Sequence, residues 1–195
     1  FTKGKKVLLD NLIKVYDDTI KKIKPGIQIW LINLDVIPGS PGVVASPAEI
    51  DVALAEGDKN FKALKKRYGD RVLPVYHQTE SGERLREVAS MGKYIALGFR
   101  QDFAEKDRVR HAEETLRVTE SLGCKTHGLA TTGYSMLSRT NFDSVDSASW
   151  LYAAAMGKVL MINERRAITT LPISAQSPLQ KDYRGHYASL SGGEQ

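Results

Sequence analysis

The sequence predicts an α/β fold of the parallel βα-barrel type. Segments with the features of strands and of helices alternate along the chain, giving six strands in all. Such alternation implies a parallel sheet with right-handed crossovers, either a closed barrel or an open doubly wound sheet. No glycine fingerprint follows the first strand, whereas polar residues follow several strands, as in barrels that carry their chemistry at the carboxyl ends of the strands. We therefore expect a TIM-type (β/α) barrel.

The chain length sets the expected extent of this barrel. With 195 residues and 42% apolar content, the chain can bury one full-sized core, so we expect a single domain over residues 1–195. A complete barrel usually needs about 250 residues, and the chain opens with Phe1 rather than with methionine. We therefore expect a chain truncated at the N-terminus that lacks the first barrel strand.

The first half of the chain contains three expected helices and two expected strands. Apolar residues at a three-then-four spacing predict a helix over 7–24, which Pro25-Gly26 ends. A nearly continuous apolar run predicts a buried strand over 27–37. Ser46-Pro47-Ala48-Glu49 forms a capping box and predicts a helix to about residue 68, which Gly57 could interrupt. A short strand over 72–77 and a helix over 83–91 follow.

The second half repeats the alternation. A strand is expected over 94–98, and Asp102-Phe103-Ala104-Glu105 resembles a second capping box opening a helix that Gly123 terminates. The pattern becomes irregular after Asn163, so we expect residues 163–195 to lack regular elements, with a loop at 171–178. The remaining expected elements are strands over 125–130, 142–146 and 158–162 and helices over 134–139 and 149–156.

Composition limits the class of protein. The formal net charge of +5 favours a polyanionic partner without demonstrating one. Cys124 is the only cysteine, which rules out an internal disulfide and a multi-cysteine zinc cluster within this chain. No apolar run is long enough to span a membrane, and the start lacks a signal-peptide core, so we expect a soluble cytoplasmic protein without a membrane partner.

Polar residues at the expected strand ends are the candidate site. They include two aspartates on one segment, Asp143 and Asp146, which face opposite sides of an ideal strand because they are three residues apart. An aspartate here can also cap the next helix, and Asp35 can simply shape a turn. The full set is Asp35, His77, Gln78, Gly98, Arg100, His127, Asp143 and Asp146.

Four motifs in this set resemble those of one family. The segment Phe142-Asp143-Ser144-Val145-Asp146-Ser147 is similar to the nucleophile strand of the tRNA-guanine transglycosylases (queuine and archaeosine tRNA-ribosyltransferases). Base-recognition motifs of that family are similar to Asn33-Leu34-Asp35-Val36, Pro74-Val75-Tyr76-His77-Gln78 and Tyr94-Ile95-Ala96-Leu97-Gly98, in the same order. The resemblance covers about residues 30–155 and is strongest for the phage-type branch associated with 7-deazaguanine in DNA.

The resemblance implies a function and a set of roles. Asp146 would be the nucleophile, with Asp143 as the competing assignment, and guanine in a polynucleotide would be exchanged for a 7-deazaguanine base through a covalent glycosyl intermediate. Asp35, Gln78 and Gly98 would shape the base pocket, and His127 is a further substrate-binding candidate. Arg100, Arg108 and Arg110 are candidates for holding the polynucleotide backbone. No metal and no cofactor are required.

The sequence departs from the family in two places. The family's early general-base aspartate has no counterpart, and the cysteine and histidine zinc site of the tRNA enzymes is absent because only Cys124 exists. The second departure favours DNA over tRNA as the nucleic-acid partner. The sequence does not fix the oligomeric state, and a homodimer is compatible with it.

Two alternative functions stay open. His77 and His127, with Asp146 or Asp35, could hold a metal ion and make a metal-dependent barrel hydrolase. A non-catalytic barrel could instead bind nucleic acid through its positive charge alone, in which case replacing Asp146 by asparagine would leave binding unchanged.

Overall fold

The computed structural model describes residues 7–38, 45–100, 102–164 and 168–174. The chain divides into two compact units, which are described separately: the first contains residues 1–98 and 118–126, and the second contains residues 99–117 and 127–195. Helices alternate with parallel strands, so the predicted mixed α/β fold with a parallel sheet is confirmed. The expected start at Phe1 and the segment 175–195 lie outside the described residues.

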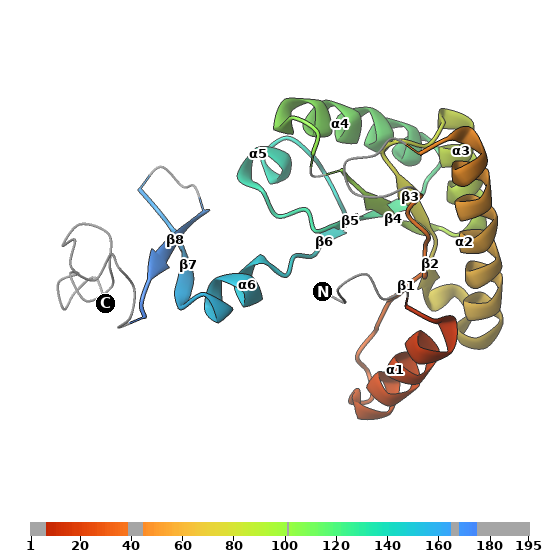
Figure 1. Cartoon of the computed structure of the whole chain (residues 1–195), viewed down its shortest axis with the longest axis horizontal. Coiled ribbons are helices and arrows are strands. Elements are labelled where there is room, and N and C mark those ends of the chain that lie inside the picture. Colours follow the sequence, from red (N-terminus) through yellow and green to blue (C-terminus); the bar gives the residue numbers. More distant parts are fainter. Residues whose placement is uncertain (1–6, 39–44, 101, 165–167, 175–195) are drawn as a thin grey trace. The chain divides into compact units, whose positions relative to one another are not determined.

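The first unit contains the elements from the N-terminal helix to the fourth strand (Figure 1). The predicted helix at residues 7–24 forms, and the helix at residues 46–68 is continuous through Gly57. The predicted strand at 27–37 is paired over two residues only. The bounds are α1 Leu9–Lys22, β1 Leu31–Ile32, α2 Pro47–Tyr68, the 3-10 turn η1 Gly69–Arg71, β2 Val72–Leu73, β3 Val75–His77, α3 Gly82–Met91 and β4 Tyr94–Gly98.

Local chemistry explains where α2 begins. The Ser46 hydroxyl accepts a hydrogen bond from the Glu49 backbone N–H, and the Glu49 carboxylate accepts one from the Ser46 N–H at 2.8 Å. This is the reciprocal capping box that the sequence predicts, and Pro47 occupies the first helical position, where no intrahelical donor is needed.

The strands of the first unit follow one another in chain order. Pro74 separates β2 from β3 because it has no N–H to offer a partner strand, yet the two strands run on directly. Before this proline, β1 pairs parallel with β2, with Leu31 opposite Val72. After it, β3 pairs parallel with β4, with His77 opposite Gly98. The larger sheet has the order β3-β4-β5-β6.

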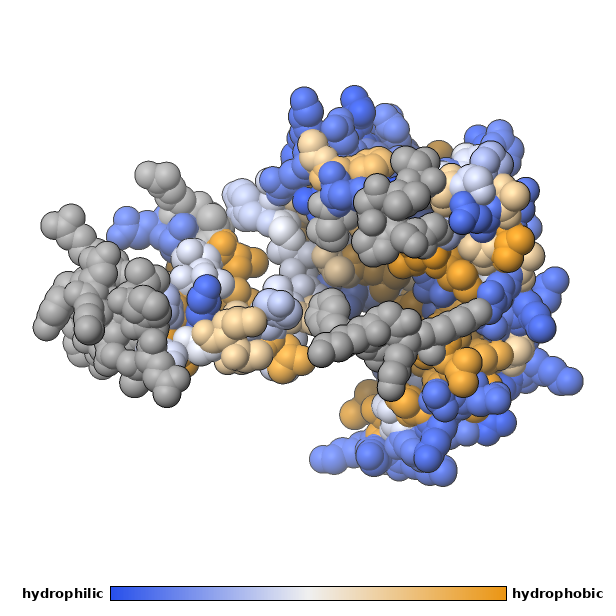
Figure 2. Space-filling model, in the orientation of Figure 1, coloured by the Kyte–Doolittle hydropathy of each residue, from blue (hydrophilic) through white to orange (hydrophobic). Residues whose placement is uncertain are grey.

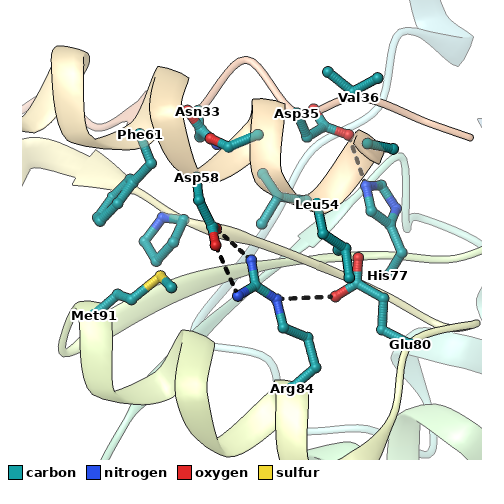
Figure 3. A pocket seen from close by; sticks show the side chains of 14 residues that line it. Asn33, Asp35, Val36, Leu54, Asp58, Phe61, His77, Glu80, Arg84 and Met91 are labelled. Atoms are coloured by element: carbon teal, nitrogen blue, oxygen red, sulfur yellow. Dashed lines mark hydrogen bonds and ion pairs between the residues drawn. The ribbon is translucent and has the colours of Figure 1, made fainter. Parts of the chain in front are cut away.

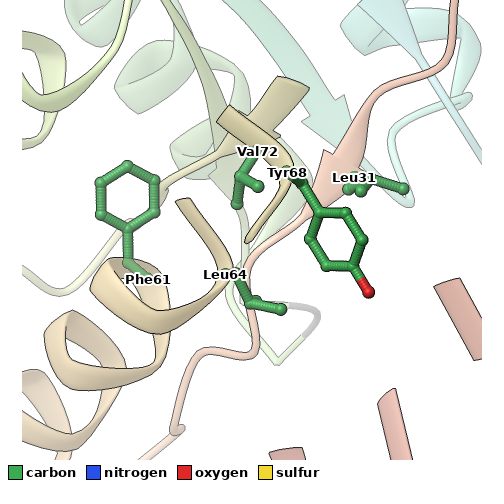
Figure 4. Packing of buried hydrophobic residues seen from close by; sticks show 5 residues of the cluster. All are labelled: Leu31, Phe61, Leu64, Tyr68 and Val72. Carbon is green, nitrogen blue, oxygen red and sulfur yellow. The ribbon is translucent and has the colours of Figure 1, made fainter. Parts of the chain in front are cut away.

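One apolar cluster joins α2 to the first strands (Figure 4). Its buried members come from α2, β1 and β2, and the apolar face of α1 packs against them. Leu64 is completely buried, and the Tyr68 hydroxyl donates to the Ile13 carbonyl at 3.1 Å, which ties α2 to α1. The five buried residues are Leu31, Phe61, Leu64, Tyr68 and Val72.

The second unit contains most of α4 and the elements after it. A smaller apolar cluster of Val109, Ala112 and Met136, with Phe99 and Phe142 against it, forms its core. Strands β5 and β6 pair parallel, with His127 opposite Ser144. The bounds are α4 Glu105–Ser121, β5 Lys125–Leu129, α5 Tyr134–Leu137, β6 Ser144–Val145, α6 Ser149–Ala155, β7 Lys158–Ile162 and β8 Ile168–Pro172.

Two sequence predictions about the C-terminal part are wrong. Strand β7 does not continue the parallel sheet but pairs antiparallel with β8, with Leu160 opposite Thr170. Residues 168–172 therefore form a strand within the segment predicted to be irregular, because the β-branched run Ile168-Thr169-Thr170 can pair with β7. The predicted loop at 171–178 begins inside that strand.

Helix α4 starts later than predicted and ends as predicted. Its first residue is Glu105, and Asp102 binds Arg100, with the Arg100 Nε 2.9 Å from a carboxylate oxygen, so the predicted capping box at 102–105 is wrong. At the other end, Gly123 has φ +63°, and the Cys124 N–H donates to the Thr119 carbonyl at 2.9 Å. This is a Schellman-type end, which needs the left-handed conformation that glycine adopts easily.

Helix α6 and strand β7 carry an exposed apolar surface (Figure 2). Exposed side chains on these two elements include Trp150, Leu151, Tyr152, Leu160 and Ile162. Even so, within the described ranges, no helix combines the length and the apolar character that a membrane span requires.

Candidate functional site

Two buried asparagines hold the segment that carries Asp35. The Asn33 side chain donates to the Gly57 carbonyl at 3.0 Å, and the Asn60 side chain donates to the Leu34 carbonyl at 2.9 Å. The chain leaving β1 is thereby fastened to α2 on both sides of Leu34. Asp35 is the next residue, so this pair of amides sets the position of its backbone.

Asp35 binds His77 at the end of β3. The His77 Nε2 lies 2.6 Å from the Asp35 Oδ2, and the two side chains are 21% and 29% exposed. The His77 ring lies against Gly98, its partner in the neighbouring strand: a Cβ at residue 98 would lie 2.6 Å from the His77 Nδ1. The His77 imidazole therefore leaves room only for glycine at position 98. This packing requirement is separate from any contact between the backbone and a ligand.

Surrounding charges favour the protonated imidazole. Burial acts to lower the pKa of His77, but the hydrogen bond and charge of Asp35 and the charge of Glu80 outweigh it, and the pKa lies above its ordinary value. For the Glu80 carboxyl, burial acts in the opposite direction and raises the pKa, and the charges of His77 and Arg84 offset only part of that rise. Both groups hold a proton more tightly than they do in water.

Arg84 completes this cluster from α3 (Figure 3). Its guanidinium makes a two-pronged contact with Asp58 at 2.5 and 3.1 Å and lies 3.8 Å from the Glu80 carboxylate. The Asn33 Oδ1, the Glu80 Oε2 and the Arg84 Nε are buried without a hydrogen-bond partner. A cavity of about 20 Å³, whose lining includes these three residues, has room for about one water molecule.

A second, much larger cavity of about 520 Å³ also borders Asp35. It lies between the start of α1, the chain that follows β1, and α2, and its volume is within the range of small-molecule sites, about 300–1,000 Å³. Apolar residues make most of its wall, including Leu34 and Ile37, and the polar side chains are those of Asp35, Glu56 and Asn60. Asp35 and its neighbour Val36 thus line both cavities, and Asp35 is the ionisable residue that the two cavities share.

Asp146 follows β6 in the second unit, and one of its carboxylate oxygens has two hydrogen-bond partners. The Ala130 N–H donates to the Asp146 Oδ1 at 3.0 Å, and the His127 Nε2 lies 3.2 Å from the same oxygen. Ala130 has φ +51°, an uncommon conformation for a residue with a side chain, and it stands directly after β5. The Asp146 side chain is 57% exposed.

The register of β5 and β6 explains this contact. His127 is paired with Ser144, and Asp146 is two residues further on, so Ser144 and Asp146 lie on the same side of the chain. The His127 Nδ1 lies 2.6 Å from the Ser144 Oγ. Both ring nitrogens of His127 therefore have partners within the protein.

Asp146 does not cap the next helix. The Ser149 N–H, at the start of α6, donates to the Ser147 hydroxyl at 3.0 Å. The capping interpretation of Asp146 is therefore wrong, because its carboxylate turns back to Ala130 and His127. These contacts are made by Asp146 and not by Asp143, which precedes β6 and is exposed.

The other predicted residues have different surroundings. Gln78 is 9% exposed, and its backbone N–H donates to the Gly98 carbonyl at 3.0 Å. Arg100 stacks over the Phe103 ring as well as binding Asp102, and Arg110 binds Asp107 at 3.1 Å. Arg100 and Arg110 thus already have anionic partners on the surface of the second unit.

The metal-dependent alternative finds no ligand set in the described part of the chain. His77 binds Asp35 and His127 binds Asp146, each as a separate pair. The described residues contain no group of three or more histidine, cysteine, aspartate or glutamate side chains that could hold a metal ion.

Several residues of these sites were not predicted. Glu80 and Arg84 lie in a turn and a helix, where charged residues usually face water, and their roles arise only from burial against Asp58. Asn33 and Asn60 could have been recognised from the sequence as buried polar residues, because asparagine is unusual within an apolar strand and on the inner face of a helix. Ser144 could have been found from its place two residues before Asp146.

Comparisons of the chain with protein-family models, with curated proteins and with solved structures give no significant match.

Proposed function

We propose that this chain is a transglycosylase that exchanges guanine in a polynucleotide for a 7-deazaguanine base, with DNA favoured over tRNA. The observation that carries the proposal is the state of the Asp146 carboxylate. One oxygen is held by Ala130 and His127, while the side chain remains 57% exposed and its other oxygen has no hydrogen-bond partner among the described residues. A carboxylate held in this way suits nucleophilic attack on a sugar carbon.

The proposal includes a βα barrel as the scaffold. The strand order supports it, since β1 pairs with β2, β3 runs directly on from β2, and β3 to β6 pair in chain order. A doubly wound sheet instead reverses its order at a switch point. Strands in unbroken chain order are what a barrel requires.

The reaction would proceed in two displacements. In the first, the Asp146 Oδ2 forms a bond to the sugar carbon C1′ as the bond from C1′ to guanine breaks; guanine leaves with the electron pair and takes a proton from water. In the second, the incoming 7-deazaguanine attacks C1′ and loses its ring N–H proton to water, and the electron pair of the ester bond returns to Asp146. Charges and protons balance without a metal or a redox partner.

Asp35 would recognise the base. An ionised carboxylate accepts hydrogen bonds only, and guanine and its 7-deaza analogues present adjacent N–H donors on one edge. The cavity of about 520 Å³ beside Asp35 has enough volume for a purine-sized ring. Gln78 and Gly98, next to His77, belong to the same proposed recognition region, which would receive an extruded base.

Base exchange can be measured directly. DNA and tRNA carrying labelled guanine are incubated separately with the protein and 7-cyano-7-deazaguanine, and released label is counted. We expect release from DNA, loss of release in Asp146→Asn, and retention in the matched control Asp143→Asn. Release from neither polymer would remove the proposal, and a covalent adduct on Asp143 would move the nucleophile to that residue.

The same variant separates the enzyme from a module that only binds nucleic acid. If Asp146→Asn leaves both polynucleotide binding and the biological effect unchanged, the protein acts by binding. The proposal requires that binding persists while exchange is lost.

A further inference from the structure

Three side chains form a hydrogen-bonded series across β5 and β6. The Ser144 Oγ lies 2.6 Å from the His127 Nδ1, and the His127 Nε2 lies 3.2 Å from the Asp146 Oδ1. The order serine, histidine, aspartate is also that of a serine nucleophile with its base and orienting acid. The exposure of the two ends of the series decides whether Ser144 or Asp146 is the residue that reacts with the substrate.

The exposed end of the series is the aspartate. The Asp146 side chain is 57% exposed and that of His127 is 15% exposed, while Ser144 is half-buried. A serine nucleophile needs the reverse arrangement, in which the acid is buried behind the histidine and the hydroxyl meets the substrate. Ser144 is therefore the supporting end and Asp146 the reacting end.

Proton positions follow from the chemistry of the three groups. An ionised carboxylate only accepts, so the hydrogen of His127 must lie on Nε2, facing Asp146. The Nδ1 of the neutral ring is then an acceptor, and the Ser144 hydroxyl can donate to it at 2.6 Å. The Asp146 carboxylate thus sets the tautomer, and the Ser144 hydroxyl satisfies the Nδ1 that this tautomer leaves as an acceptor.

The Ala130 N–H supplies a second donor to the same oxygen at 3.0 Å. Two donors from β5 and the residue after it fix Oδ1, and a carboxylate with one fixed oxygen has its plane and its second oxygen fixed as well. Donors placed before the reaction cost no reorganisation during it.

We infer that His127 is a positioning residue for the Asp146 nucleophile and that Ser144 holds the His127 ring in place by donating to its Nδ1. This inference rests on the proposed function and assigns His127 a role other than contact with the base. As Oδ2 bonds to the sugar carbon, Oδ1 becomes the carbonyl oxygen of the ester and keeps both donors. The same two donors hold the carboxylate ready for release in the second displacement.

Variants of His127 test the inference through the rate of base exchange. In His127→Leu, kcat should fall by about 10- to 100-fold, the effect of losing one hydrogen bond to a charged group, while KM changes by less than about threefold. In His127→Gln, the side-chain amide can replace the Nε2–H, so most of the lost rate should return. Ser144→Ala should lower kcat by a smaller factor and leave folding intact.

The tautomer offers a measurement that needs no substrate. Nitrogen-15 NMR of the His127 ring should show Nε2 protonated in the wild type and a mixture of tautomers in Asp146→Asn, whose side-chain amide can donate as well as accept. A ring protonated on Nδ1 alone would overturn the inference. So would labelling of Ser144 by a fluorophosphonate, because the series would then work in the opposite direction.

The outcomes distinguish this inference from the proposed function. If Asp146→Asn abolishes exchange but His127→Leu matches the wild type, or if His127→Gln is no better than His127→Leu, the positioning role is wrong and the enzyme assignment stands. If the wild type exchanges no base, the proposed function is wrong, and the NMR measurement still decides whether His127 donates to Asp146.

Discussion

Replacing Gly98 with alanine tests how tightly His77 and Asp35 are held. The new Cβ would lie 2.6 Å from the His77 Nδ1, so the ring must withdraw by about 0.8 Å to reach ordinary contact. A shift of this size can carry the 2.6 Å contact between His77 and Asp35 beyond hydrogen-bond range. Losing a hydrogen bond between charged groups costs about 1.5–3 kcal/mol, and replacing glycine in a strand returns about 0.5–1 kcal/mol. We expect Gly98→Ala to destabilise the protein by about 1–2 kcal/mol.

Urea unfolding measures this change, with Gly57→Ala as the matched control. A Cβ at residue 57 would meet no atom closer than 3.9 Å, so the control should be stabilised by about 0.5–1 kcal/mol as glycine leaves a helix interior. A double-mutant cycle with His77→Ala should remove most of the cost of Gly98→Ala, because the clashing ring is gone. If Gly98→Ala costs the same with and without His77, the packing argument is wrong.

Three further predictions concern charge and capping. The contribution of His77 and Glu80 to the free energy of unfolding should fall as the pH rises, because folding raises both pKa values and each contribution is lost as the pH passes through the raised value. Burial lowers the pKa of His111 and gives the opposite pH dependence, so the test compares the wild type with His77→Ala by urea unfolding at about pH 6 and about pH 9. A larger destabilisation by His77→Ala at the higher pH would contradict the prediction. Arg84→Met should destabilise by about 2–3 kcal/mol in thermal unfolding, since it leaves Asp58 and Glu80 without their cation, whereas Arg84→Lys should cost less. Ser46→Ala should cost about 1 kcal/mol and lower the helical circular dichroism signal, and an unchanged melting temperature would refute the role of the cap.

Local signals in the sequence predicted the helices better than the strands. The capping box at Ser46 and the glycine end at Gly123 depend on residues close in sequence, so both are confirmed. The strand at 27–37 is paired only over Leu31–Ile32, because its extent depends on a partner far along the chain that pairs over the same two positions. The antiparallel pairing of β7 and β8 was missed for the same reason, although the run Ile168-Thr169-Thr170 carries a strand signal.

The sequence placed the candidate aspartates and histidines at strand ends, but it did not predict which of these residues pair. Asp35 and Asp146 follow strands, which is where the sequence placed its candidate residues. That His127 lies opposite Ser144, and His77 opposite Gly98, depends on strand register, which a single sequence does not specify. The cluster around Arg84 depends on burial, and charged residues in turns and helices rarely indicate burial by their type.

Asp35 lines two cavities. The larger has the volume of a ligand site, and the smaller contains the ionisable side chains of His77, Glu80 and Arg84. A ligand that draws the Asp35 carboxylate toward the larger cavity weakens the hydrogen bond between Asp35 and His77. Ligand binding and proton release then become a single equilibrium, so the dissociation constant of any such ligand should vary with pH.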